Sequence, residues 1–135
     1  MNNNLENNLY YTPTIEEFHI GFEYEEYQFL ERNWKTVKCE FIKPNTTIDS
    51  KWFRVKYLDQ SDIESLGWEF EKEHVGLEQL SFSINGPIYE DILYMDFDSK
   101  YMRIAWLGEG DITRFSGTIK NKSELIKLMQ QLNIK

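Results

Sequence analysis

Hydrophobic and polar residues alternate in three stretches of the first half of the chain, and a period of two predicts strands with one buried face. The three predicted strands are residues 18–24, 37–41 and 53–57. Two short helices are predicted at 14–18 and 62–66, because each begins beside a Ser or Thr that has a Glu three residues further on. The first half is therefore expected to combine strands with short helical segments.

The second half is predicted to be a meander of antiparallel strands. Apolar residues alternate or cluster in four stretches, and turn-forming residues such as Asp98-Ser99-Lys100 separate them. The predicted strands are residues 80–84, 88–97, 101–107 and 112–119.

The clearest predicted element is a helix at the C-terminal end. Asn121 is expected to cap it, with Glu124 as its capping-box partner. Its apolar residues recur at the spacing i, i+3, i+4 and i+7 of one helix face, as Leu125, Leu128, Met129 and Leu132. This stripe is expected to pack on the sheet.

Together these elements predict an α+β fold, with an antiparallel, strongly bent sheet or partly open barrel of about six or seven strands closed by the C-terminal helix. Residues 1–12 are polar and Asn-rich and are predicted to be a flexible leader. Residues 13–135 are predicted to form a single domain. The apolar content of 41%, with 16% aromatic residues, is that of a folded chain with an aromatic core.

The charge balance limits the classes of partner. The chain has 15 Lys and Arg against 23 Asp and Glu, which gives a net charge of −8. Such a surface repels phosphate backbones and anionic lipids, so neither a nucleic acid nor a membrane is predicted as a partner. The single Cys39 excludes an internal disulfide and a cysteine-built zinc site, and it is expected to be buried. A cytoplasmic location is expected, because no stretch reaches the ~20 apolar residues of a membrane helix and no signal region is recognised.

No catalytic residue, metal site or cofactor is predicted. His19 and His74 have no partner at metal-ligand spacing and no local group that would orient either of them as a general base. Asp96 and Asp98 share one side of a strand end, as a Mg²⁺ or Ca²⁺ site would need, but a solvated hairpin has the same pattern. Whether the chain is an enzyme stays open, with a small hydrolase that uses scattered carboxylates as one alternative.

Aromatic and basic residues are the candidates for binding. Trp52 falls on the face opposite Phe53 and neighbours Arg54, and an aromatic ring beside a cation suits a protein hot spot or a stacked base. The structural alternative is a second sheet face covered by a helix. The candidate residues for binding a ligand or partner are Trp52, Arg54, Lys56, Arg103, Trp106 and Arg114.

Three segments carry a resemblance to known proteins. They are Ile15–Glu25, the pair Arg54–Asp59 and Asp62–Gly67, and Ile119–Leu125. In their order and their amino-acid sequence they resemble a group of small uncharacterised phage and prophage proteins of gut-type bacteria. The resemblance implies a phage accessory or host-interaction role and assigns no residue a catalytic part. The expected cytoplasm is then that of the bacterial host.

The leading hypothesis is a non-catalytic binding module for a host or phage protein. The first alternative is an anti-defence sponge that sequesters a nucleotide second messenger, with Arg54, Lys56, Arg103 or Arg114 on its phosphates and a Trp on its base. The oligomeric state stays open.

Overall fold

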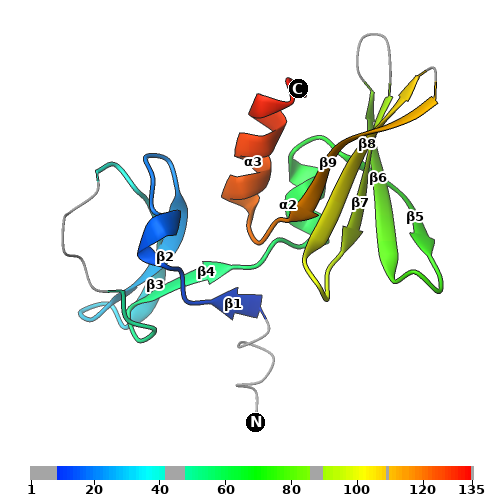
Figure 1. Cartoon of the computed structure of the whole chain (residues 1–135). Helices are drawn as coiled ribbons and strands as arrows, with labels where there is room; N and C mark the ends of the chain where they lie inside the picture. The colour runs from blue at the N-terminus through cyan, green and yellow to red at the C-terminus, as the bar shows by residue number, and fades with distance from the viewer. Residues whose placement is uncertain (1–8, 42–47, 86–89, 109, 135) are drawn as a thin grey trace. The chain divides into compact units, whose positions relative to one another are not determined.

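The computed structural model describes residues 9–41, 48–85, 90–108 and 110–134. The chain divides into two compact units, Met1–Tyr57 and Leu58–Lys135, each with its own antiparallel sheet (Figure 1). The α+β class and the C-terminal helix are confirmed, but the prediction of one bent sheet or barrel is wrong. The described strands form two open sheets of four and five strands. Periodicity identifies strands without identifying their neighbours. Among the described residues, no ladder joins the strands before Tyr57 to those after it.

The first unit is a four-stranded sheet with the order β1-β4-β2-β3. Its elements are β1 (Tyr10–Tyr11), the 3-10 turn η1 (Ile15–Glu17), β2 (Glu23–Gln28), β3 (Asn33–Lys38) and β4 (Phe53–Lys56). Part of the predicted leader is thus in a strand, and residues 1–8 lie outside the described part. The Glu17 carboxylate accepts the backbone N–H of Thr14 at 2.7 Å, as the capping box predicts.

The predicted strand 18–24 is wrong over most of its length. Gly21 has a φ of +94°, a conformation that suits glycine, and its N–H donates to the Cys39 carbonyl at 2.8 Å. The chain therefore turns there, and the strand starts at Glu23 and runs to Gln28.

The second unit is a meander with the order β5-β6-β7-β8-β9 and two helices. Its elements are α2 (Gln60–Ser65), β5 (Glu69–His74), β6 (Gln79–Asn85), β7 (Glu90–Asp96), β8 (Tyr101–Gly108), β9 (Gly110–Thr118) and α3 (Lys122–Gln131). Each of the four predicted strands has a counterpart here, although residues 88 and 89 lie outside the described part. β5 was not predicted, because its residues Glu-Phe-Glu-Lys-Glu-His are mostly charged and show no apolar alternation.

Both helices of the second unit are capped, with differences from the prediction. α2 begins earlier than expected, because Asp59 is the cap and accepts the N–H of Asp62 at 2.8 Å. Asn121 caps α3 as predicted, by accepting the N–H of Glu124 at 2.9 Å. The Glu124 carboxylate reaches the N–H of Lys120.

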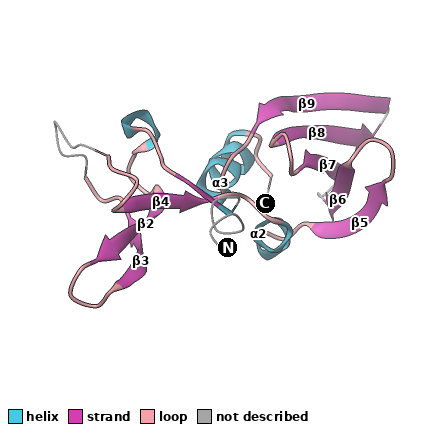
Figure 2. Ribbon diagram, turned by 90° about the horizontal axis from the view of Figure 1, so that it is seen from below, coloured by secondary structure: helices cyan, strands magenta, loops and turns pink. Residues whose placement is uncertain are grey.

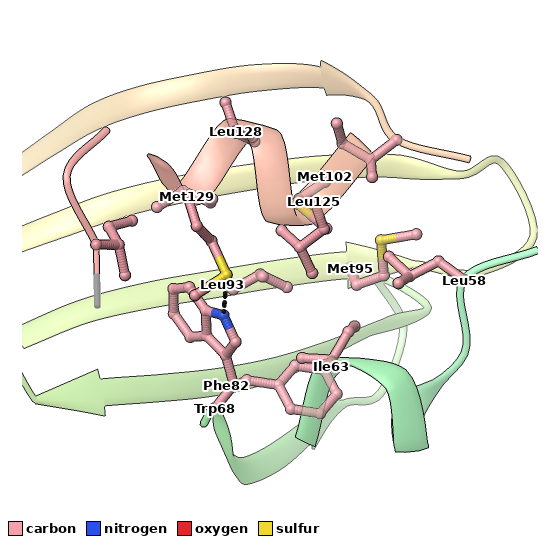
Figure 3. Packing of buried hydrophobic residues seen from close by; sticks show 13 residues of the cluster. Leu58, Ile63, Trp68, Phe82, Leu93, Met95, Met102, Leu125, Leu128 and Met129 are labelled. Atoms are coloured by element: carbon pink, nitrogen blue, oxygen red, sulfur yellow. Dashed lines mark hydrogen bonds between the residues drawn. The ribbon is translucent and has the colours of Figure 1, made fainter. Parts of the chain in front are cut away.

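Helices α2 and α3 lie on the same side of the five-stranded sheet (Figure 2). The α3 stripe is confirmed as a packing face, because Leu125, Leu128 and Met129 are buried. They pack with Phe82 and Leu93 of the sheet (Figure 3). The described residues contain no helix that is long and apolar enough to cross a membrane.

The core of the first unit is much smaller. Its hydrophobic core cluster has three buried residues, Phe22, Cys39 and Val55, so the predicted burial of Cys39 is confirmed. The edges of aromatic rings pack around this core, with the Phe18 ring 5.1 Å from Phe22 and 4.9 Å from Tyr24. A sheet with so few buried residues leaves much of its apolar surface exposed.

Candidate functional site

One face of the four-stranded sheet gathers aromatic rings around a single arginine. Strand alternation places Arg54 on the sheet face opposite that of Phe53, which lies in the groove described below, and of the buried Val55. The register pairs Arg54 with Glu25 and Tyr27 with Trp34. We call this surface the aromatic face. It consists of Tyr10, Glu25, Tyr27, Phe29, Trp34, Trp52 and Arg54.

Arg54 is held between two rings and a carboxylate. Its guanidinium carbon lies 3.8 Å from the ring centre of Tyr10 and 4.2 Å from that of Trp34. Its Nη2 donates to Glu25 Oε1 at 2.9 Å, and its Nε donates to the same oxygen at 3.2 Å. These contacts combine cation–π attraction with an ion pair, so the charge of Arg54 is already matched within the protein.

Trp52 lies between the residues around Arg54 and the tip of the β2–β3 hairpin. Its ring centre lies 4.2 Å from that of Phe29 and 6.1 Å from that of Tyr27. Phe29 is 65% exposed, and the next residue, Leu30, is 99% exposed. Large apolar side chains are therefore open to solvent at this end of the aromatic face.

The opposite face of the same sheet carries a groove of about 700 Å³. Its apolar part comes from Phe18, Tyr24 and Phe53, and it extends along residues 35–41. Burial raises the pKa of the Tyr24 phenol, and the negative charge of Glu26 acts in the same direction. The Tyr24 side chain is thus partly withdrawn from water, whereas Phe41, which also lines the groove, is 66% exposed.

The six predicted binding residues divide between the units. Trp52, Arg54 and Lys56 belong to the first unit, where Lys56 is half-buried and pairs with Tyr10 of β1. The other three belong to the second unit, which contains Arg103, Trp106 and Arg114.

The three candidates of the second unit do not share one surface. Trp106 pairs with Asp91, on the sheet face that packs against α3, whereas Arg103 alternates to the other face. The Arg103 guanidinium carbon lies 4.4 Å from the Tyr94 ring centre, and its Nη1 donates to Thr113 at 3.2 Å.

Arg114 is a structural residue of the second unit. Its Nη1 donates to Asp91 at 2.8 Å, and its Nη2 donates to the Leu132 carbonyl at the end of α3. Both contacts lie within the protein, so they connect β9 to β7 and to the helix.

Several residues of the aromatic face were missed in the sequence, above all Glu25, Tyr27 and Phe29. Glu25 and Tyr27 share one face of β2 because they are two positions apart, but the apolar alternation stops at Tyr24, since Glu26 and Gln28 are polar, so no local pattern marks this face. The pairing of Arg54 with Glu25, 29 positions away, has no local signal.

Acidic and histidine side chains do not gather into a site in the described part of the chain, where no group of three or more His, Cys, Asp or Glu could hold a metal ion. Asp96 Oδ1 instead accepts the N–H groups of Asp98 and Ser99 at 3.0 and 3.3 Å. The hydrogen bonds from Ser99 lower the pKa of the Asp96 carboxyl, and the N–H of Asp98 and the charge of Lys100 add to this effect.

A change in acid sensitivity is expected for Asp96→Asn. The pKa of Asp96 is lower in the folded state than in the unfolded state, where it is about 3.9. The carboxylate therefore stabilises the fold at pH values above the unfolded-state pKa, and this stabilisation is lost as the pH falls through the folded-state pKa. Thermal melts between about pH 5 and pH 2 should therefore show a smaller loss of Tm in Asp96→Asn than in the native protein. Asp98→Asn makes the same change in net charge and leaves the Asp96 hydrogen bonds in place. Equal slopes for native protein and Asp96→Asn would contradict the assignment.

Comparison of the chain with protein families, curated proteins and solved structures gives no match.

Proposed function

We propose that this chain is a non-catalytic binding module that engages a protein of a phage or of its bacterial host through the aromatic face of the first unit. The observation that carries the proposal is the exposed apolar end of this face, where Phe29 lies against Trp52 and Leu30 projects into solvent. The assignment to a phage or host partner rests on the resemblance of the three sequence segments.

The composition of the aromatic face suits a protein partner. Binding hot spots are enriched in Trp, Tyr and Arg, and they lie in patches whose rims exclude water. The Tyr27 ring already contacts those of both Trp34 and Trp52, so little side-chain freedom remains to be lost on binding.

Exposure of this surface has a free-energy cost for the isolated protein. Covering a Phe or Leu side chain fully contributes about 1.5–3 kcal/mol. Phe29 and Leu30 forgo most of that contribution until a partner covers them. A surface of this kind is typical of a protein-interaction site.

A nucleotide ligand has weaker support. Arg54 is paired with Glu25, so a phosphate would have to compete with a carboxylate already bound to the guanidinium. The net charge of −8 opposes phosphate at longer range. We therefore expect cyclic di- and trinucleotides to leave the Tm unchanged in a thermal-shift screen.

Trp52→Ala is expected to weaken partner binding at least tenfold, because a central hot-spot residue contributes about 2 kcal/mol or more. The immobilised native chain and the variant are incubated with lysate of phage-infected bacteria, and captured proteins are quantified by mass spectrometry. The Kd of the captured protein is then measured by calorimetry with the purified pair.

The matched control is Val75→Ala, which shortens an exposed apolar side chain of the second unit and should bind as the native chain does. Circular dichroism checks that Trp52→Ala is folded. Equal capture by native chain and Trp52→Ala would reject the aromatic face as the contact surface. A Tm rise of several degrees with a nucleotide, lost in Arg54→Ala, would favour the sponge.

A further inference from the structure

Strand β3 lies at one end of the four-stranded sheet and pairs with β2 on one side alone in the described part of the chain. At its end, the Cys39 N–H donates to the Phe22 carbonyl and the Cys39 carbonyl accepts from Gly21, both at 2.8 Å. The backbone groups of Cys39 therefore point toward β2. In an antiparallel strand, the N–H and C=O of successive residues point to alternate sides.

The free side of β3 is consequently formed by the backbone groups of Trp34, Thr36 and Lys38. The β2–β3 register is regular from Glu23 to Gln28, so this alternation runs through the whole strand. The backbone hydrogen bonds of the described residues include none that would occupy these outward groups. A row of outward N–H and C=O groups is a template for an added strand.

The groove runs along this free edge. All residues from Lys35 to Phe41 line it, and the sheet supplies Tyr24 and Phe53 as its apolar floor. Side chains of an added strand alternate between the two sheet faces. One set would enter the groove, and the other would lie beside Trp34 on the aromatic face.

The charge of β3 defines what can pair with it. The strand has two lysines and no acid. On the paired side, β2 places Glu23 opposite Lys38 and Glu26 opposite Lys35, and the Lys38 Nζ lies 3.9 Å from Glu23 Oε1. Opposite charges directly across strands are stabilising, and like charges are destabilising.

We propose that β3 binds an extended segment of the partner protein by antiparallel strand addition, and that this segment has acidic residues opposite the lysines and apolar residues over the groove. The proposal rests on the proposed function and specifies the form of the partner. A second copy of this chain is a poorer fit, because lysines on an edge strand disfavour pairing with an identical strand.

The probe is a synthetic peptide with the sequence of residues 22–29, capped at both ends. This segment contains β2, whose acidic and aromatic residues already complement β3 in the folded protein. A second peptide has Lys in place of each Glu. Binding is followed by fluorescence anisotropy of labelled peptide, and the Lys peptide is expected to bind at least tenfold more weakly. Equal binding of both peptides would overturn the charge argument.

The decisive variant is Thr36→Pro. Proline is tolerated on an edge strand where its missing N–H faces away from the sheet, so the β2–β3 ladder should persist while the free edge loses its central donor. Thr36→Ala is the matched control, because it keeps the N–H. Peptide affinity is expected to fall at least tenfold in Thr36→Pro and to stay within twofold in Thr36→Ala. Native-like binding by a folded Thr36→Pro would overturn the proposal.

Amide exchange tests the same edge in the native protein, independently of whether the proline variant folds. The amides of Trp34, Thr36 and Lys38 should exchange at least tenfold faster than those of Lys35 and Val37, and they should become protected when the peptide binds. Protection of these three amides in the free monomer, or a native dimer that Thr36→Pro dissociates, would overturn the proposal. Partner capture that is lost in Trp52→Ala but unchanged in Thr36→Pro would reject strand addition and leave the proposed function intact.

Discussion

Replacing Trp68 with Ala is expected to lower the free energy of unfolding by about 3–5 kcal/mol, as for other buried Trp and Phe residues. Trp68 is 2% exposed and lies between α2 and β5. Its Nε1 donates to the sulfur of Met129 on α3 at 3.4 Å (Figure 3). Truncation leaves a cavity among Ile63, Phe82 and the α3 stripe, because residues from three elements pack around the indole.

Denaturant unfolding followed by circular dichroism measures the effect of this change. Trp68→Phe keeps an aromatic ring and loses the indole N–H, so it should cost clearly less than Trp68→Ala. Ile126→Ala is the control on the outer side of α3, where the side chain is 36% exposed, and it should change stability by about 0.5 kcal/mol or less. A loss below about 1 kcal/mol for Trp68→Ala would show that the second unit does not depend on this packing.

Arg114→Ala is expected to cost about 3 kcal/mol, because removing one partner of a buried ion pair leaves the other charge without compensation. Asp91 is 6% exposed and accepts from Arg114 at 2.8 Å. The same guanidinium caps the Leu132 carbonyl, which is among the last acceptors of α3. The Arg114 side chain is 26% exposed, so water can partly solvate Asp91 when the arginine is removed. The expected loss in free energy of unfolding is therefore at the lower end of the range for buried ion pairs.

A double-mutant cycle with Asp91→Asn separates the charge effect from the loss of packing. Asp91→Asn with Arg114→Ala should be more stable than the sum of the single changes predicts, because the neutral amide no longer needs a cation. Arg103→Ala is the matched control, since that arginine contacts Tyr94 and Thr113 at the other sheet face. Strict additivity in the cycle would show that the Arg114–Asp91 contact contributes nothing as a pair.

Local patterns in the sequence were sufficient for the elements that bury one regular stripe. The spacing of Leu125, Leu128 and Met129 identified α3 and its packing face, because apolar residues three and four apart lie together on a helix. The four strands β6 to β9 were recognised for the same kind of reason, by runs and alternation of apolar residues. Trp52 and Arg54 were correctly placed on the face opposite Phe53, because side chains of a strand point to alternate sides.

Only the tertiary structure decided which strands are neighbours and which side chains meet. The strands separate into two sheets, which no local pattern indicates. The contacts of Arg54 with Glu25 and of Arg114 with Asp91 join residues that are far apart in the chain. The free edge of β3 belongs to the same group, since a strand's own residues do not determine whether another strand lies beside it. Hydrophobic periodicity indicates whether each residue is buried or exposed. Strand pairing depends instead on which distant segments of the chain come together and on the loops that must close between them. The aromatic face and the groove therefore became visible only when β1, β2, β3 and β4 were assembled into one sheet.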